Sequence, residues 1–63
     1  MSEPDWDALQ AANDELRELH DAGKLTRKAY DRLLEDATTA VGDREEYLEG
    51  ILMRGLELGF VEP

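Results

Sequence analysis

LTRKAYDRLLEDATTAVG, residues 25–42, carries the most complete helical pattern in this 63-residue chain. Thr26 is a typical N-cap residue, and Gly42 offers the left-handed conformation that ends many helices. Between them, apolar side chains recur at the spacing i, i+3, i+4, i+7 and i+11, which places them on one helical face. These positions are Tyr30, Leu33, Leu34, Ala37 and Val41. The pattern predicts a helix over about residues 27–41 with one buried face.

The segment before this stretch has its own start and stop signals. Ser2 is a candidate N-cap with Asp5 three residues later, Pro4 suits a first helical turn, and Gly23 is placed to end the helix. Its apolar stripe consists of Trp6, Leu9, Ala12, Leu16 and Leu19. A helix is therefore predicted over about residues 3–22.

A third helix is predicted over about residues 44–58. Asp43 and Glu46 have the spacing of a capping box, and Gly59 is expected to end the helix. Gly55 would permit close approach of a neighbouring helix. The buried face is expected to contain Tyr47, Leu48, Ile51, Leu52, Gly55 and Leu56.

Short connections between three helices imply antiparallel neighbours, so the predicted fold is all-α, a compact three-helix bundle formed as a single domain by residues 1–63. A chain of this length buries little apolar surface, and a second copy could complete the bundle. Met53, Leu58 and Phe60 are expected to mark the seam of such a homodimer. Phe60 and Val61 could also fold back onto the apolar surface of the bundle.

The composition restricts the partners. The chain has 16 acidic and 7 basic residues, a formal net charge of -9, and no cysteine. Phosphate backbones and anionic lipids repel such a surface, so we expect no direct binding to nucleic acid and no binding to membranes. The absence of cysteine, of an apolar leader and of a long apolar run predicts a cytoplasmic protein.

The inventory of reactive side chains favours a non-enzymatic protein. His20 is the only imidazole, and no cysteine is present to pair with it. Carboxylate pairs at i, i+4 spacing, such as Asp31 with Glu35 or Glu45 with Glu49, include no imidazole and are incomplete as zinc or calcium sites. We therefore expect no metal and no cofactor.

The charge is unevenly distributed along the chain. Residues 1–23 carry -6, residues 24–41 carry +1 and residues 42–63 carry -4. Four acids of the first helix fall within about 60° of one another at 100° per residue, opposite the apolar stripe. A second acidic group, with an aromatic residue between its members, begins the third helix. The candidate partner-binding residues are Asp7, Asp14, Glu18, Asp21, Glu45, Glu46, Tyr47 and Glu49.

Two resemblances accompany these patterns. Residues 16–34 contain Leu16-x-x-Leu19, Ala22-Gly23, Leu25-Thr26 and Tyr30 with Leu33-Leu34, and they resemble the short helical hairpin called SHOCT, which implies an oligomerisation or docking segment. In size, acidity and lack of cysteine, the whole chain is similar to the small phage anti-CRISPR and anti-restriction proteins that mimic DNA. That likeness implies that rows of carboxylates occupy a Lys/Arg groove in place of phosphates.

The leading hypothesis is therefore a non-enzymatic acidic inhibitor that competes with nucleic acid for a basic groove on a DNA-binding effector. Its partner would be the basic surface of a nucleic-acid-binding protein. The alternative is a salt-adapted helical oligomerisation or scaffold module, in which the acidity serves solubility. The sequence leaves both hypotheses open, because a row of carboxylates suits either role.

Overall fold

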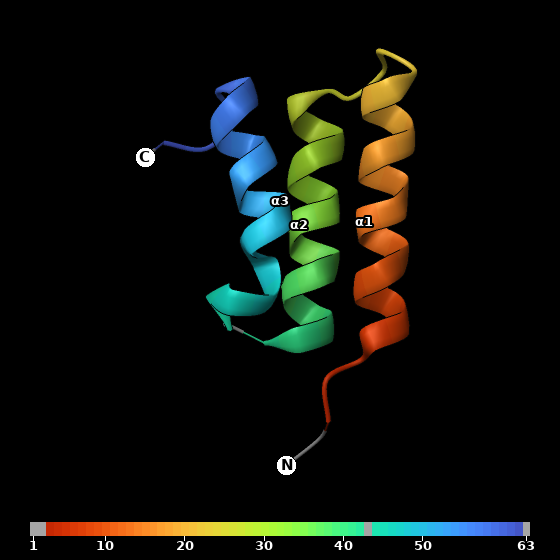
Figure 1. Cartoon of the computed structure of the whole chain (residues 1–63), viewed down its shortest axis with the longest axis vertical. Coiled ribbons are helices and arrows are strands. Elements are labelled where there is room, and N and C mark those ends of the chain that lie inside the picture. Colours follow the sequence, from red (N-terminus) through yellow and green to blue (C-terminus); the bar gives the residue numbers. More distant parts are fainter. Residues whose placement is uncertain (1–2, 43, 63) are drawn as a thin grey trace.

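The computed structural model describes residues 3–42 and 44–62. Within these ranges, the chain forms three helices, α1 (Trp6–Asp21), α2 (Arg27–Val41) and α3 (Glu45–Leu58), and no strand. Figure 1 shows α1 and α3 pointing in the same direction on either side of α2, which runs antiparallel to both. The prediction of an all-α three-helix bundle is confirmed.

Helix α2 has the predicted bounds because its signals are local. The Thr26 hydroxyl oxygen accepts a 3.1 Å hydrogen bond from the Ala29 N–H, and so caps one of the free donors at the helix start. At the other end, Gly42 has a φ of 74° and donates its N–H to the Thr38 carbonyl at 2.7 Å. The stop therefore uses a backbone conformation that glycine adopts without steric penalty.

Helix α1 begins at Trp6, three residues later than predicted. The N-cap is Asp5, whose carboxylate accepts a 3.1 Å hydrogen bond from the Ala8 N–H, while Ser2, the predicted cap, lies outside the described residues. Pro4 disfavours the helical conformation in the residue before it. The Asp5 N–H also donates to the Ala40 carbonyl at 2.8 Å, and this contact joins the start of α1 to the end of α2.

The end of α1 agrees with the prediction, whereas α3 begins at a different N-cap residue from the predicted one. Gly23, with a φ of 69°, ends α1 as expected: its N–H bonds the His20 carbonyl and the next N–H bonds the Leu19 carbonyl. At the start of α3, Arg44 occupies the N-cap and its side chain makes no capping hydrogen bond. The predicted cap, Asp43, lies outside the described residues.

One hydrophobic core joins the three helices, and its largest almost completely buried side chains are Tyr30, Leu33 and Ile51. Two predicted core residues are exposed. Trp6 is 51% exposed because it begins α1 and packs on one side only. Leu56 is 40% exposed because it is rotated by about 100° around α3 from the buried Gly55 and faces outward. The buried core contains Leu9, Ala12, Leu16, Tyr30, Leu33, Ala37, Val41, Leu48 and Ile51.

The residues after α3 fold back onto the bundle. The Phe60 ring lies 5.5 Å from the Tyr30 ring, centroid to centroid, and Val61 packs against the core. Phe60 therefore does not belong to an exposed seam with Met53 and Leu58. These last two side chains are exposed, but five residues place them about 140° apart around α3. The predicted homodimer seam is thus not a single surface, and dimerisation itself stays a prediction.

Gly55 lets α3 approach α2 closely, as its position in the sequence predicted. A Cβ atom there would overlap the Tyr30 hydroxyl and lie 2.6 Å from a methyl carbon of Val61.

Within the described ranges, none of the helices has both the length and the apolar character needed to cross a lipid bilayer.

Candidate functional site

The predicted acidic row of α1 faces solvent. Its members are exposed, and the opposite side of the helix is fixed to the core by Leu9, Ala12 and Leu16. With a rise of 1.5 Å per residue, neighbouring carboxylates of the row are separated by about 5–10 Å along the axis. We call this surface the α1 acid row, and it consists of Asp7, Asp14, Glu18 and Asp21.

Most of the α1 acid row is free of ion pairs. Among the described residues, the Lys and Arg side chains that form ion pairs are Arg32, with Glu15 at 3.1 Å and Asp36 at 3.7 Å, and Arg54, with Glu57 at 2.9 Å. The remaining pair joins His20 and Asp21 at 3.8 Å and exists only when the imidazole is protonated. Three carboxylates of the row, those of Asp7, Asp14 and Glu18, therefore remain available to a partner.

The acidic group of α3 lies around an apolar depression. Glu45, Glu46 and Glu49 are exposed, and together with Leu52 and Met53 they line a hollow of about 290 Å³. The sequence predicted the three glutamates as a group, but it did not predict the hollow between them. The periodicity placed Leu52 in the core and Met53 in a dimer seam, so neither was expected beside these acids.

Tyr47 does not lie among these glutamates. Its ring packs edge-on against the Trp6 ring of α1, with 4.8 Å between centroids and an interplanar angle of 85°. The Arg44 guanidinium lies 5.7 Å from the centre of the same ring. Tyr47 therefore lies on the flank of α3 that faces α1, whereas Glu45 lines a hollow with Leu34 and Thr38 of α2.

The two acidic groups predicted from the sequence lie on different helices. The α1 acid row and the α3 glutamates belong to two different helices, which lie on either side of α2 in the view of Figure 1 and touch each other through Trp6 and Tyr47. The row points away from the core that joins α1 to its neighbours, and Glu45 borders the junction of α2 with α3. A partner with a single narrow basic groove would thus meet one of these surfaces at a time.

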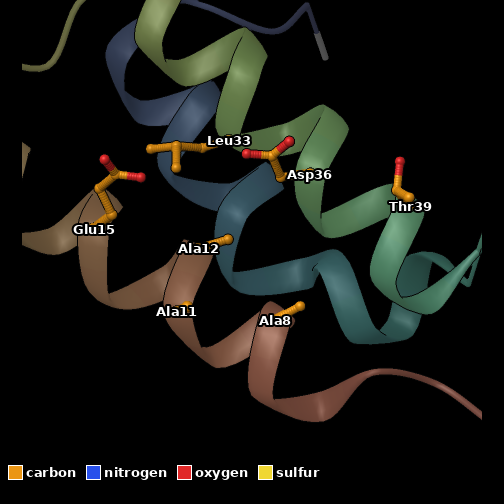
Figure 2. Close-up of a pocket in the computed structure, with 7 residues that line it drawn as sticks. All are labelled: Ala8, Ala11, Ala12, Glu15, Leu33, Asp36 and Thr39. Atoms are coloured by element: carbon orange, nitrogen blue, oxygen red, sulfur yellow. The ribbon is translucent and has the colours of Figure 1, made fainter.

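A further hollow of about 380 Å³ lies between α1 and α2 (Figure 2). Its floor is made largely of alanine side chains, and its two carboxylates, Glu15 and Asp36, are both paired with Arg32. The sequence analysis did not predict this hollow. The small side chains of α1 leave the space open, but helical periodicity alone does not show that the neighbouring helix leaves it unfilled. The lining residues are Ala8, Ala11, Ala12, Glu15, Leu33, Asp36 and Thr39.

The buried titratable group has a structural role. Burial raises the pKa of the Tyr30 hydroxyl, the nearby Asp31 carboxylate raises it further, and a hydrogen bond with the Gly55 backbone opposes both effects. This hydroxyl donates to the Ile51 carbonyl at 2.7 Å and is enclosed by the core. Within the described ranges, no charged side chain is buried, and no three His, Asp or Glu side chains gather closely enough to hold a metal ion.

The α1 acid row presents exposed carboxylates, and the hollow on α3 combines glutamates with Leu52 and Met53. In comparisons with known proteins, the chain matches no protein-family model, no curated protein and no solved structure. The resemblances to SHOCT hairpins and to DNA-mimic inhibitors accordingly stay predictions.

Proposed function

We propose that the protein is a non-enzymatic acidic inhibitor that binds a basic groove of a DNA-binding effector in place of nucleic acid. The observation that supports this proposal is the α1 acid row, because three of its carboxylates are exposed and outside the ion pairs of the described residues. Four acids on one side of a helix repel one another, and a surface adapted for stability alone would interleave bases.

The rigidity of α1 favours this role. Three buried side chains on the opposite face fix the helix, so the carboxylates are held in a line without a large loss of conformational freedom on binding. Duplex DNA carries one charge per 3.4 Å of axis on each strand, whereas the α1 acid row carries one per roughly 5–7 Å. The row would therefore replace a few phosphates, and its attraction for a basic groove would fall as salt is added.

The test is competition with DNA. Restriction-type and CRISPR-type effectors would each be loaded with a fluorescent duplex, and the protein would be titrated at several salt concentrations. We expect displacement of the duplex from at least one effector, weakening as salt rises. The variant with Asp14→Lys and Glu18→Lys should lose the displacement while keeping its helical circular dichroism.

A matched control separates local charge from total charge. Glu35→Lys with Glu62→Lys changes the net charge equally but leaves the α1 acid row intact, and both side chains are exposed. This control should still displace DNA. If both double variants behave alike, the row is not the binding surface. A protein that loses helicity in dilute buffer, forms a defined dimer in sedimentation and displaces no duplex would instead be the salt-adapted scaffold.

A further inference from the structure

A shallow groove runs from the junction of α2 and α3 onto the outer side of α3. It consists of two neighbouring hollows of about 300 and 290 Å³, which have Glu45 and Leu52 in common. The first hollow is lined by Leu34, Thr38, Glu45, Leu48 and Leu52. The second is lined by Glu45, Glu46, Glu49, Leu52 and Met53. We call this surface the α3 groove.

The floor of the α3 groove is apolar and continues into exposed apolar surface. Leu34 and Leu52 are half-buried, Met53 is 52% exposed, and Leu56, one helical turn beyond Met53, is 40% exposed. Long aliphatic and thioether side chains on one exposed strip are typical of surfaces that bind the apolar face of another helix. Within the described ranges no strand edge is present to add an extended peptide, so a helix is the matching occupant.

The rim of the groove is acidic. Glu45, Glu46 and Glu49 border it, and neither hollow is lined by a Lys or Arg side chain. Arg54 does not neutralise this rim, because it is paired with Glu57 at 2.9 Å. Arg27 lies in the first turn of α2, which is beside the last turns of α3, whereas the rim begins at the first turn of α3. An occupant must therefore carry positive charge around an apolar face.

A second copy of this chain does not meet that requirement. Its own α3 would bring the same glutamates toward the rim, and residues 42–63 carry a net charge of -4. DNA and anionic lipid would be repelled for the same reason. We propose that the α3 groove binds a basic amphipathic helix of a partner protein, with the apolar face of that helix on Leu52, Met53 and Leu56.

This surface is separate from the α1 acid row, so the inference goes beyond the proposed function. An inhibitor could use the α1 acid row on a DNA groove and the α3 groove on a helix of the same or another protein. Each proposal can fail alone, because the residues that carry them lie on different helices.

The probe is a synthetic peptide of leucine and lysine, about five helical turns long, with leucine at helical spacing. Two controls share its length: a scrambled peptide of the same composition, and a leucine–glutamate peptide with the same spacing. The chain contains only two methionines, so ¹³C-methyl labelling gives one signal for Met53 and a second, separate signal for Met1. We expect the amphipathic basic peptide to shift the Met53 signal and to bind roughly tenfold more tightly than either control peptide.

Met53→Glu is the decisive variant. The added carboxylate increases attraction for a basic peptide, so a loss of affinity can come only from the lost apolar contact. We expect a loss of roughly tenfold, whereas Gln10→Glu, which adds the same charge on the exposed surface of α1, should not weaken binding. Met53→Leu, which keeps the apolar volume, should retain the affinity.

The following outcomes would overturn the inference: an unmoved Met53 signal, equal binding of the scrambled peptide, or unchanged affinity in Met53→Glu. Broadening of the Met53 signal with protein concentration alone would identify a second copy as the occupant instead. The variant with Asp14→Lys and Glu18→Lys should keep its preference for the amphipathic over the scrambled peptide. That result would hold even if the same variant showed that the α1 acid row has no role in DNA competition.

Discussion

The buried hydroxyl of Tyr30 donates a 2.7 Å hydrogen bond to the backbone carbonyl of Ile51, and this bond fastens α2 to α3. The Tyr30 side chain can reach α3 because Gly55 has no Cβ in its path. Phe60 then packs against the Tyr30 ring from the chain segment that follows α3. Tyr30 therefore helps to position α3, and with it the α3 groove, through both a hydrogen bond and ring packing.

Removing the hydroxyl should loosen the bundle without unfolding it. Tyr30→Phe keeps the ring and its packing but loses the hydrogen bond to Ile51, so we expect the free energy of unfolding to fall by about 1 kcal/mol. For a domain of this size, that loss lowers the melting temperature by about 4–8 °C. Thermal and urea unfolding followed by circular dichroism would measure both, and an unchanged melting temperature would contradict the role given to the hydroxyl.

The same hydroxyl predicts a dependence of stability on alkaline pH. Burial, followed by the nearby Asp31 charge, raises the pKa of Tyr30 in the folded protein above the value of about 10 in the unfolded chain. Below pH 10 the hydroxyl is protonated in both states and the stability is fully present. As the pH rises above 10, only the unfolded chain releases the proton readily, so stability falls. Urea unfolding at pH 9 to 11 should show this decline, and Tyr30→Phe should reduce it.

Two glycines of α3 should respond oppositely to the same substitution. At Gly55, a Cβ would collide with Tyr30 and Val61, and we expect Gly55→Ala to cost about 1–3 kcal/mol despite the better helix propensity of alanine. At Gly50, a Cβ would meet only Asn13 Oδ1 at 3.8 Å, an ordinary contact. Gly50→Ala should therefore stabilise the protein by up to about 1 kcal/mol. Similar changes in urea midpoint for both variants would show that α3 does not approach α2 as closely as described.

The α1 acid row should reduce stability in dilute buffer. Glu18→Lys converts a repulsive i, i+4 relationship with Asp14 into an attractive one and places a cation near the carboxyl end of α1. We expect a gain of about 0.5 kcal/mol at low ionic strength, and the gain should nearly vanish at 1 M salt, where charges are screened within about 3 Å. If Glu18→Lys destabilises α1 at every salt concentration, the carboxylate has a structural partner.

The helices were predictable to the extent that their signals are local. Thr26 and Gly42 lie beside the helix that they delimit, so both bounds of α2 follow from the sequence. The predicted start of α1 was wrong because Asp5 is the N-cap, and its N–H bonds the Ala40 carbonyl, which is 35 residues away in sequence. No capping pattern contains such a contact.

For the candidate site, the sequence predicts which side chains face solvent but not which helix each flank of α3 contacts. Helical periodicity is enough to place Asp14 and Glu18 on the solvent side of α1. It cannot say which flank of α3 meets α1 and which meets α2, because both flanks have the same spacing from the core. The side-by-side packing of three helices decides this, and it directs Tyr47 to Trp6 and Glu45 to the junction with α2.

The hydrogen bond from the Asp5 N–H to the Ala40 carbonyl makes two distant helix ends cooperative. Ala40 lies in the last turn of α2, where carbonyl groups lack helical partners, and Asp5 both supplies one donor and caps α1. Fraying at either end therefore exposes the other. Asp5 precedes the first residue of α1, and yet its amide proton should exchange with solvent only when the start of α1 and the end of α2 open as one unit.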